Sequence, residues 1–269
     1  QVAKTQPMKL AAMEGYYEGR EGAGLVAVGL LNPDKEKYND GKDPFIFRVE
    51  IPQMLSLLAK RELNAFVPGV KDIIEGGYVQ KDGTVALSAA EKIERGKKAI
   101  AALASYRSAK KEGNTATADS AYVTLQENMA YFGYGYIKDV HHLVPNVPIT
   151  FYAFRIMVML GFYFILFFAV VLFLVYKDKL AEMKWMHWIA LLTIPLGYIA
   201  AEAGWVVAEC GRQPWAIQDL LPTAVSVSRV SVGSVQLTFY IFLVLFTVML
   251  IAEVGIMLRE IKKGPELNK

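Results

Sequence analysis

Three long apolar runs limit the folds open to this chain more than any other feature of its sequence. No formally charged residue occurs over 21 residues at 156–176, 17 residues at 185–201 and 23 residues at 230–252. Because about 20 apolar residues are enough to span a bilayer as a helix, each run predicts a transmembrane helix. The expected helices are about 149–176, 185–209 and 230–258.

The charged residues gather in the first half of the chain. Residues 1–148 hold 19 of the 29 Lys and Arg residues and 18 of the 26 Asp and Glu residues. This segment is therefore polar and nearly neutral, and the net charge of +3 for the whole chain is too small to suggest a nucleic-acid partner. We divide the chain into a polar domain at 1–148 and a transmembrane part at 149–269.

Most of the polar domain is expected to be helical. Ser88 can cap a helix, and apolar residues recur after it at helical spacing. Stretches 19–47 and 75–87 are rich in Gly, Asp and Lys and predict loops. The expected fold class is an all-α membrane protein, in which a mostly helical polar domain precedes three transmembrane helices of a larger helical bundle. Helices in the polar domain are expected at 7–17, 49–63, 88–111 and 119–137.

The short connections indicate how the helices cross the membrane. The connection 177–184 carries three lysines, and the tail 259–269 carries four basic residues. The connection 210–229 carries only two arginines. The positive-inside rule then places 177–184 and the C-terminus in the cytoplasm, with 1–148 and 210–229 on the outer face.

One face of the second apolar helix carries polar and aromatic residues. Tyr198, Glu202, Trp205, Glu209 and Arg212 are spaced 4, 3, 4 and 3 residues apart, so they form one stripe. Polar residues within a membrane are costly and usually serve an ion path, a proton relay or a cofactor. An interfacial ion pair between Glu209 and Arg212 is the simpler alternative. It explains Glu202 poorly, because Glu202 lies about two turns deeper.

The first apolar helix opens with a cation and a thioether. Arg155 and Met157 lie just inside the expected outer interface. Arg155 could extend to the lipid headgroups, and Met157 could simply pack in a core. A thioether can also be an axial haem ligand, and a nearby cation can pair with haem propionates.

Three motifs together resemble a known family. "GWVVAECGRQPW", "FRIMV" and "QPMKLAAMEG" are similar to segments of subunit I of the cytochrome bd-type quinol oxidases. The resemblance runs the whole length of the chain but covers only the C-terminal part of that subunit. The family has nine transmembrane helices, and the three here look like the last three. Residues 1–148 resemble the quinol-binding loop that precedes them.

The resemblance implies a role for each matching residue in the membrane. Met157 matches the axial ligand of the low-spin haem b, and Arg155 matches its electrostatic partner. Glu209 matches the carboxylate ligand of the high-spin haem b, while Trp205 and Arg212 match residues beside that haem. Ferric iron would offset the cost of burying the Glu209 carboxylate.

Roles are also expected for two residues of the polar domain and for Glu202 of the second apolar helix. Lys9 and Glu14 match a pair implicated in quinol binding, where a carboxylate can accept a quinol proton. From the residues alone, the two would be solvated surface side chains that do not face each other. Glu202 is expected in a proton path or in the haem environment.

The implied activity is that of a quinol:oxygen oxidoreductase in the bacterial cytoplasmic membrane. Electrons from quinol would pass through low-spin and high-spin haem b to an oxygen-reducing haem, either haem d or a b-type variant. Water formation would build a proton gradient without pumping. The implied partners are subunit II, small accessory subunits and the N-terminal portion of subunit I, which carries the histidine haem ligands. This chain alone is not expected to be active.

Two alternatives remain open from the residues. The chain could belong to a transporter or channel in which Glu202 and Glu209 relay protons or cations. That function predicts polar residues across all three helices, and the uncharged runs argue against it. The chain could also be a non-catalytic membrane anchor whose outer domain binds a partner protein.

Overall fold

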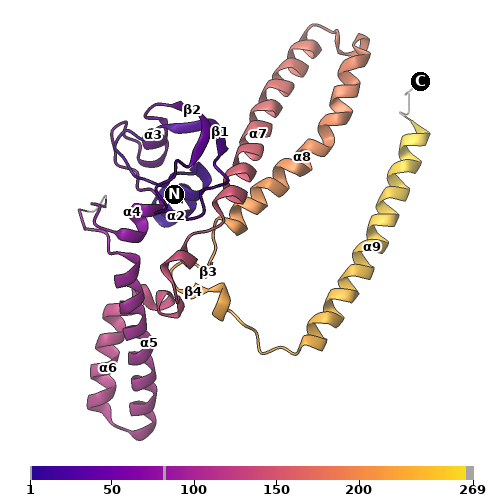
Figure 1. Cartoon of the computed structure of the whole chain (residues 1–269). Coiled ribbons are helices and arrows are strands. Elements are labelled where there is room, and N and C mark those ends of the chain that lie inside the picture. Colours follow the sequence, from indigo (N-terminus) through magenta and orange to yellow (C-terminus); the bar gives the residue numbers. More distant parts are fainter. Residues whose placement is uncertain (1, 81–82, 265–269) are drawn as a thin grey trace. The chain divides into compact units, whose positions relative to one another are not determined.

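The computed structural model describes residues 2–80 and 83–264 (Figure 1). The chain divides into two compact units, 1–226 and 227–269. Among the described residues, three helices are long and apolar enough to cross a membrane, which confirms the predicted fold class. These helices are α7 (Val147–Tyr176), α8 (Lys184–Cys210) and α9 (Val232–Lys263).

Polar caps set the starts of two membrane helices. The Asn146 side chain accepts a hydrogen bond from the Ile149 amide at the start of α7, and Ser231 accepts one from the Ser234 amide at the start of α9. α7 and α8 form a hairpin closed by the short 3-10 helix η3 (Leu180–Glu182). Within this hairpin, Tyr163 and Thr193 share a hydrogen bond of 2.6 Å, which joins the two helices.

The first part of the polar domain is built around a short helix and a β-hairpin. Helix α2 begins at a proline and ends at Gly15, whose positive φ of 60° closes the helix in the left-handed conformation. Phe45 of strand β2 contacts Phe151 of α7 with ring centroids 5.6 Å apart, so the hairpin is attached to the membrane hairpin. The elements are α1 (Val2–Thr5), α2 (Pro7–Glu14), β1 (Leu25–Leu31), β2 (Phe45–Ile51), α3 (Met54–Lys60) and α4 (Val70–Glu75).

The β-hairpin corrects two sequence-based expectations. Stretch 19–47 was predicted as loop, but it contains β1 and the first part of β2, paired antiparallel. Stretch 49–63 was predicted as one helix, but its start lies in β2, and α3 covers only its centre. The β-branched and aromatic residues of the two strands favour the pleated conformation once the strands can pair. Helix α4 was also not predicted.

The second part of the polar domain is a long helical hairpin, α5 (Ala89–Glu112) and α6 (Thr115–Asn128). Ser88 caps α5 as predicted, and Glu91 completes a capping box. The helix expected at 119–137 instead changes after α6 into the 3-10 helix η1 (Met129–Tyr136). Tighter winding lets the backbone of Gly135 lie directly against that of Gly96 in α5, where a Cβ atom would overlap it.

The connection between α8 and α9 begins as a compact loop that packs on the polar domain. Trp215 is buried in the same cluster as Ala11 of α2 and Ile93 of α5. This cluster therefore brings together three segments that are far apart in the sequence. The remaining elements are η2 (Val140–Leu143), β3 (Trp215–Ile217), β4 (Leu221–Pro222) and η4 (Thr223–Val225).

Candidate functional site

Glu14 and Arg155 form a buried ion pair between α2 and α7. Arg155 Nη2 lies 2.7 Å from Glu14 Oε2 and 2.7 Å from the Val26 carbonyl oxygen, and Nη1 donates to the Met13 carbonyl. The guanidinium also lies 4.1 Å from the centroid of the Phe151 ring. All contacts of the guanidinium are thus made within the protein, so Arg155 does not extend to the lipid headgroups.

The carboxyl group of Glu14 is almost completely buried. Its residue is 2% exposed, which is far from the solvated surface position that its sequence context suggests. Burial raises the pKa of Glu14, and the charge and hydrogen bond of Arg155 oppose that rise. A carboxyl group in this environment can hold a proton at a higher pH than an exposed glutamate.

Lys9, near the other end of α2, lies at the C-terminal end of α8. Its ammonium donates to the Ala208 carbonyl at 3.3 Å. Burial lowers the pKa of Lys9, Arg212 lowers it further, and Glu209 raises it. The two predicted quinol residues therefore face different parts of the membrane hairpin. Lys9 lies near Glu209 and Arg212, whereas Glu14 lies beside Arg155.

Glu209 and Arg212 form the close ion pair that their spacing allowed. Arg212 Nη2 lies 2.6 Å from Glu209 Oε2, and both side chains are partly exposed. The Nε–H group of Arg212 is buried and has no hydrogen-bond partner within the described residues. An unpaired donor of this kind fits an acidic group such as a haem propionate. Within the described part of the chain, no hydrogen bond reaches the other carboxylate oxygen of Glu209, so this oxygen could serve as a metal ligand.

Met157 lies in the seam between α7 and α8. A Cβ atom on Gly204 would lie 3.2 Å from the Met157 sulfur, so the sulfur rests on the glycine backbone. The side chain is half-buried, which leaves room for a further group beside it. A thioether in this apolar setting fits the axial ligand of a low-spin haem.

The rest of the predicted stripe on α8 points away from α7. Trp205 is 62% exposed, and Tyr198 and Glu202 are exposed as well. The buried face of α8 instead carries Thr193 and Ala203. The stripe thus forms an open face of the 1–226 unit, separate from the seam that holds Met157.

The described residues contain no preassembled cluster of metal-ligating side chains. No group of three His, Cys, Asp or Glu side chains there could hold a metal ion. His141 and His142 lie in the exposed part of η2, and His187 lies near the start of α8.

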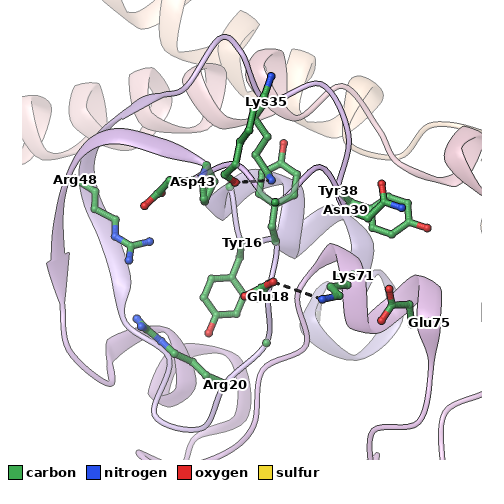
Figure 2. Close-up of a pocket in the computed structure, with 16 residues that line it drawn as sticks. Tyr16, Glu18, Arg20, Lys35, Tyr38, Asn39, Asp43, Arg48, Lys71 and Glu75 are labelled. Carbon is green, nitrogen blue, oxygen red and sulfur yellow. Dashed lines mark hydrogen bonds and ion pairs between the residues drawn. The ribbon is translucent and has the colours of Figure 1, made fainter.

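The polar domain contains a pocket of about 710 Å³, and the residue that follows Glu14 in the sequence is part of its lining (Figure 2). Its lining begins at Gly15 and includes three tyrosines and the ion pair between Glu18 and Lys71, whose charged atoms lie 3.6 Å apart. Burial raises the pKa of Tyr17 to about 12. No residue of this pocket was singled out from the sequence, and most of its lining comes from the stretch 19–47 that was expected to be loop.

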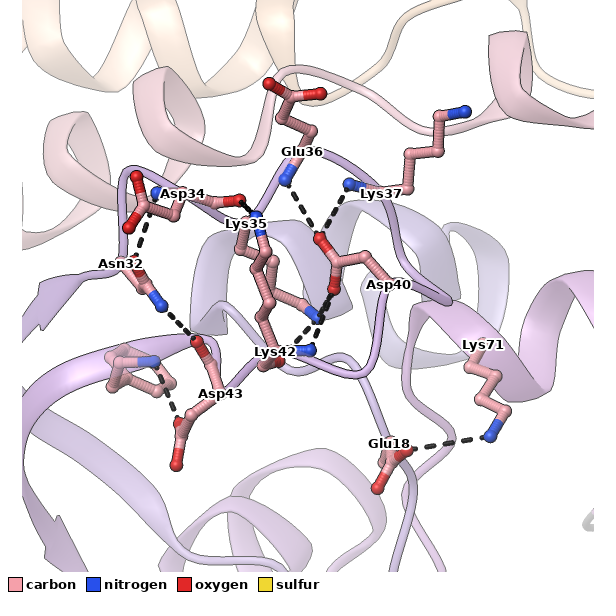
Figure 3. A network of polar contacts seen from close by, with 11 residues as sticks. Glu18, Asn32, Asp34, Lys35, Glu36, Lys37, Asp40, Lys42, Asp43 and Lys71 are labelled. Atoms are coloured by element: carbon pink, nitrogen blue, oxygen red, sulfur yellow. Dashed lines mark hydrogen bonds and ion pairs between the residues drawn. The ribbon is translucent and has the colours of Figure 1, made fainter.

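One wall of the pocket is held by a closed network of polar contacts (Figure 3). Lys35 Nζ lies 2.7 Å from Asp40 Oδ1 and donates to the Lys42 carbonyl at 2.8 Å. Asp40 also accepts hydrogen bonds from three backbone amides, and Lys42 Nζ donates to the Asp34 carbonyl at 2.6 Å. The loop 32–43 is therefore fixed by its own side chains, and Lys35 lies 4.6 Å from the centroid of the Tyr17 ring.

Comparison with known proteins places these residues in context. Residues 1–265 match the family model described as cytochrome bd terminal oxidase subunit I. The chain is 32% identical over 267 residues to cytochrome bd-II ubiquinol oxidase subunit 1 of Escherichia coli, a match that covers 98% of this chain and 50% of that protein. It is 28% identical over 267 residues to cytochrome bd ubiquinol oxidase subunit 1 of Bacillus subtilis, with 98% and 43% covered.

A solved structure shows the same fold. The bd oxidase from Geobacillus thermodenitrificans superposes with a TM-score of 0.57 at 24% identity, and the match covers 98% of this chain and 44% of the solved chain. This chain therefore spans about half the length of the curated relatives that it matches.

Proposed function

Because the chain belongs to the cytochrome bd terminal oxidase subunit I family, we propose that it supplies the quinol-binding region and part of the haem-binding region of a respiratory terminal oxidase. The proposal assigns 1–148 to an extracytoplasmic quinol-binding region and 149–269 to haem-binding helices. The main support is that α2 contacts both candidate haem sites, through Glu14 at Arg155 and through Lys9 beside Glu209.

In the quinol half of the reaction, Glu14 is proposed to accept a proton from the bound quinol. Burial raises the pKa of Glu14, so its carboxylate is a stronger proton acceptor than that of an exposed glutamate. Arg155 holds the carboxylate in place and compensates its charge when the proton is absent. Lys9 is proposed to orient the quinol oxygen as a hydrogen-bond donor.

For the haem-dependent steps, residues of this chain are proposed to bind the haems and to set their surroundings. Bound haems would supply the electron transfer from quinol and the reduction of oxygen. Met157 would hold a low-spin haem b through its thioether, and Glu209 a high-spin haem b through its free carboxylate oxygen. Arg212 would donate its unpaired Nε–H to an acidic group of the cofactor. Trp205 and Glu202 on the open stripe would line the haem environment or a proton path.

The remaining assignments concern assembly and orientation. Every described residue of α9 is exposed, and an all-exposed apolar helix requires lipid or other helices around it. Suitable partners are the N-terminal portion of subunit I, which would contribute the histidine ligands and the site of haem d or its b-type variant, together with subunit II and small accessory subunits. Basic residues at 177–184 and in the C-terminal tail favour the cytoplasmic side for both. With quinol protons released outside and oxygen reduced using cytoplasmic protons, a gradient would form without pumping.

Oxygen uptake by the complete complex tests the proposal. With quinol as donor, Glu14→Gln should lower uptake by about 100-fold or more, the usual contribution of a general base. With an artificial one-electron reductant that supplies the haems directly, uptake should stay near the wild-type rate. The exposed Glu21 offers a matched control, and Glu21→Gln should behave as wild type with both donors. Equal losses with both donors would reject the assignment of Glu14 to quinol oxidation.

A further inference from the structure

A partly buried contact far from the predicted motifs holds the loop that carries Arg212. Tyr134 of η1 donates a hydrogen bond to Asp219 Oδ1 at 2.7 Å, and the Gly133 amide donates to the Asp219 carbonyl at 3.1 Å. Gln218 Nε2 also donates to Asp219 Oδ1, at 3.0 Å. Asp219 is thus bound through both its side chain and its backbone. We call Tyr134, Asp219 and Trp215 the clasp.

Aromatic and cationic contacts enclose this hydrogen bond. The Tyr134 and Trp215 rings meet edge to face with centroids 4.9 Å apart, and Trp215 is only 5% exposed. Lys92 of α5 lies 5.7 Å from the centroid of the Tyr134 ring. Burial and the nearby Asp219 carboxylate strongly raise the pKa of Tyr134, so its hydroxyl remains a donor.

The backbone fit at the clasp leaves little freedom. A Cβ atom on Gly133 would lie 2.5 Å from the Asp219 carbonyl oxygen, so only glycine permits this approach. Asp219 itself has a φ of 61°, a conformation that Asp and Asn tolerate better than most residues. The segments that carry Tyr134 and Asp219, which are 85 residues apart in the sequence, are therefore held in a fixed position relative to each other.

A short series of hydrogen bonds connects the clasp to Arg212. The Trp215 amide donates to the Arg212 carbonyl at 3.0 Å, and the Thr223 amide donates to the Pro214 carbonyl at 2.8 Å. On the other side, Gln213 Nε2 donates to the Glu209 carbonyl at 3.3 Å. Arg212 thus lies between the end of α8 and the clasp.

We propose that Tyr134 and Asp219 are positioning residues that hold Arg212 against Glu209 and so set the geometry of the high-spin haem site. The role of that site rests on the function proposed above, whereas the restraint on the loop does not. The packing of the helical hairpin α5–α6 places η1 and Tyr134 against the loop. This hairpin would therefore influence the position of Arg212 indirectly.

The test compares three variants in the purified oxidase complex. Tyr134→Phe keeps the ring contact with Trp215 and removes only the hydroxyl. Asp219→Asn keeps an oxygen that can accept from Tyr134 and tolerates the positive φ. Tyr136→Phe makes the same chemical change at a partly exposed tyrosine of the same 3-10 helix and serves as the matched control. The measurements are deuterium exchange of the 211–223 amides and the reduced-minus-oxidised absorption spectrum.

In Tyr134→Phe, exchange in 211–223 should become about tenfold faster, since a hydrogen bond to a charged acceptor is lost. The high-spin haem signal should shift or weaken while the low-spin signal stays unchanged. In Asp219→Asn, the exchange rates and the haem spectrum should be close to those of wild type. In Tyr136→Phe, both should equal those of wild type. Unchanged exchange in Tyr134→Phe, or equal loss of both haem signals, would overturn the proposal. If Glu209→Ala leaves the haem spectrum unchanged, the haem assignment fails, and the exchange measurement alone decides whether the clasp restrains Arg212.

Discussion

Arg155 Nη2 lies 2.7 Å from Glu14 Oε2, although 141 residues separate them in the sequence. The pair joins α2 of the polar domain to the first membrane helix. It also links a residue proposed for quinol oxidation to one proposed for the low-spin haem. A proton taken up by Glu14 would therefore change the charge directly beside Arg155.

Removal of Arg155 should strongly destabilise the contact between α2 and α7. Arg155→Ala leaves the buried Glu14 carboxylate without its partner, a loss that typically costs about 3–5 kcal/mol. Arg155→Lys should be damaging too, because an ammonium cannot match the planar fork that contacts Glu14, Met13 and Val26 together. The melting temperature of the complex, followed by limited proteolysis of the polar domain, measures the effect.

Arg229 provides the control for this experiment. It is exposed in the connection before α9, and Arg229→Ala should change stability by no more than about 0.5 kcal/mol. Similar melting temperatures for the Arg155 and Arg229 variants would show that the buried pair does not support the fold.

Stability should depend on pH through Glu14 in a definite direction. The folded protein raises the pKa of Glu14 above its usual value of 4.5, so the folded state binds the proton more tightly than the unfolded state. The resulting stabilisation is present below pH 4.5 and is lost as pH rises through the raised pKa.

Melting temperatures of wild type and Glu14→Gln across this pH range measure the effect. Glu14→Gln cannot titrate at this position, so wild type should lose stability relative to the variant as pH rises. A difference that stays constant, or one that favours wild type at higher pH, would contradict the raised pKa.

Substitutions at the two glycines of α8 test whether the packing around Met157 affects the low-spin haem. Gly204→Ala places a methyl group 3.2 Å from the Met157 sulfur, so the flexible side chain must shift. Gly197→Ala makes the same change where no atom lies within 4 Å. Only Gly204→Ala should move the absorption band of the low-spin haem. Equal spectra for both variants would place that haem away from Met157.

Local sequence signals were enough for the elements whose ends depend on nearby residues. The uncharged runs located all three membrane helices, and Ser88 marked the start of α5. In contrast, the β-hairpin was missed although the β-branched and aromatic residues of its strands favour β structure. The Gly, Asp and Lys residues around the strands led to the interpretation of 19–47 as loop. The packing of the hairpin on α7 joins Phe45 and Phe151, which lie 106 residues apart by their numbering, and no short-range pattern contains that contact.

The same distinction applies to the candidate site. The spacing of Glu209 and Arg212 made their ion pair predictable, because both residues belong to one helical stripe. The contact of Lys9 with the Ala208 carbonyl and the Tyr134–Asp219 hydrogen bond join distant segments. They arise from tertiary packing, which a single sequence without homologues does not reveal.

Met157 and Glu209 are proposed to hold two different haems. A reduced-minus-oxidised absorption spectrum of the complete oxidase, recorded for wild type, Met157→Ala and Glu209→Ala, is the decisive measurement. Met157→Ala should remove or shift the low-spin b signal alone, and Glu209→Ala should disturb the high-spin signal alone. If the wild-type complex carries no haem, or if neither substitution alters the spectrum, the proposed haem ligation is wrong.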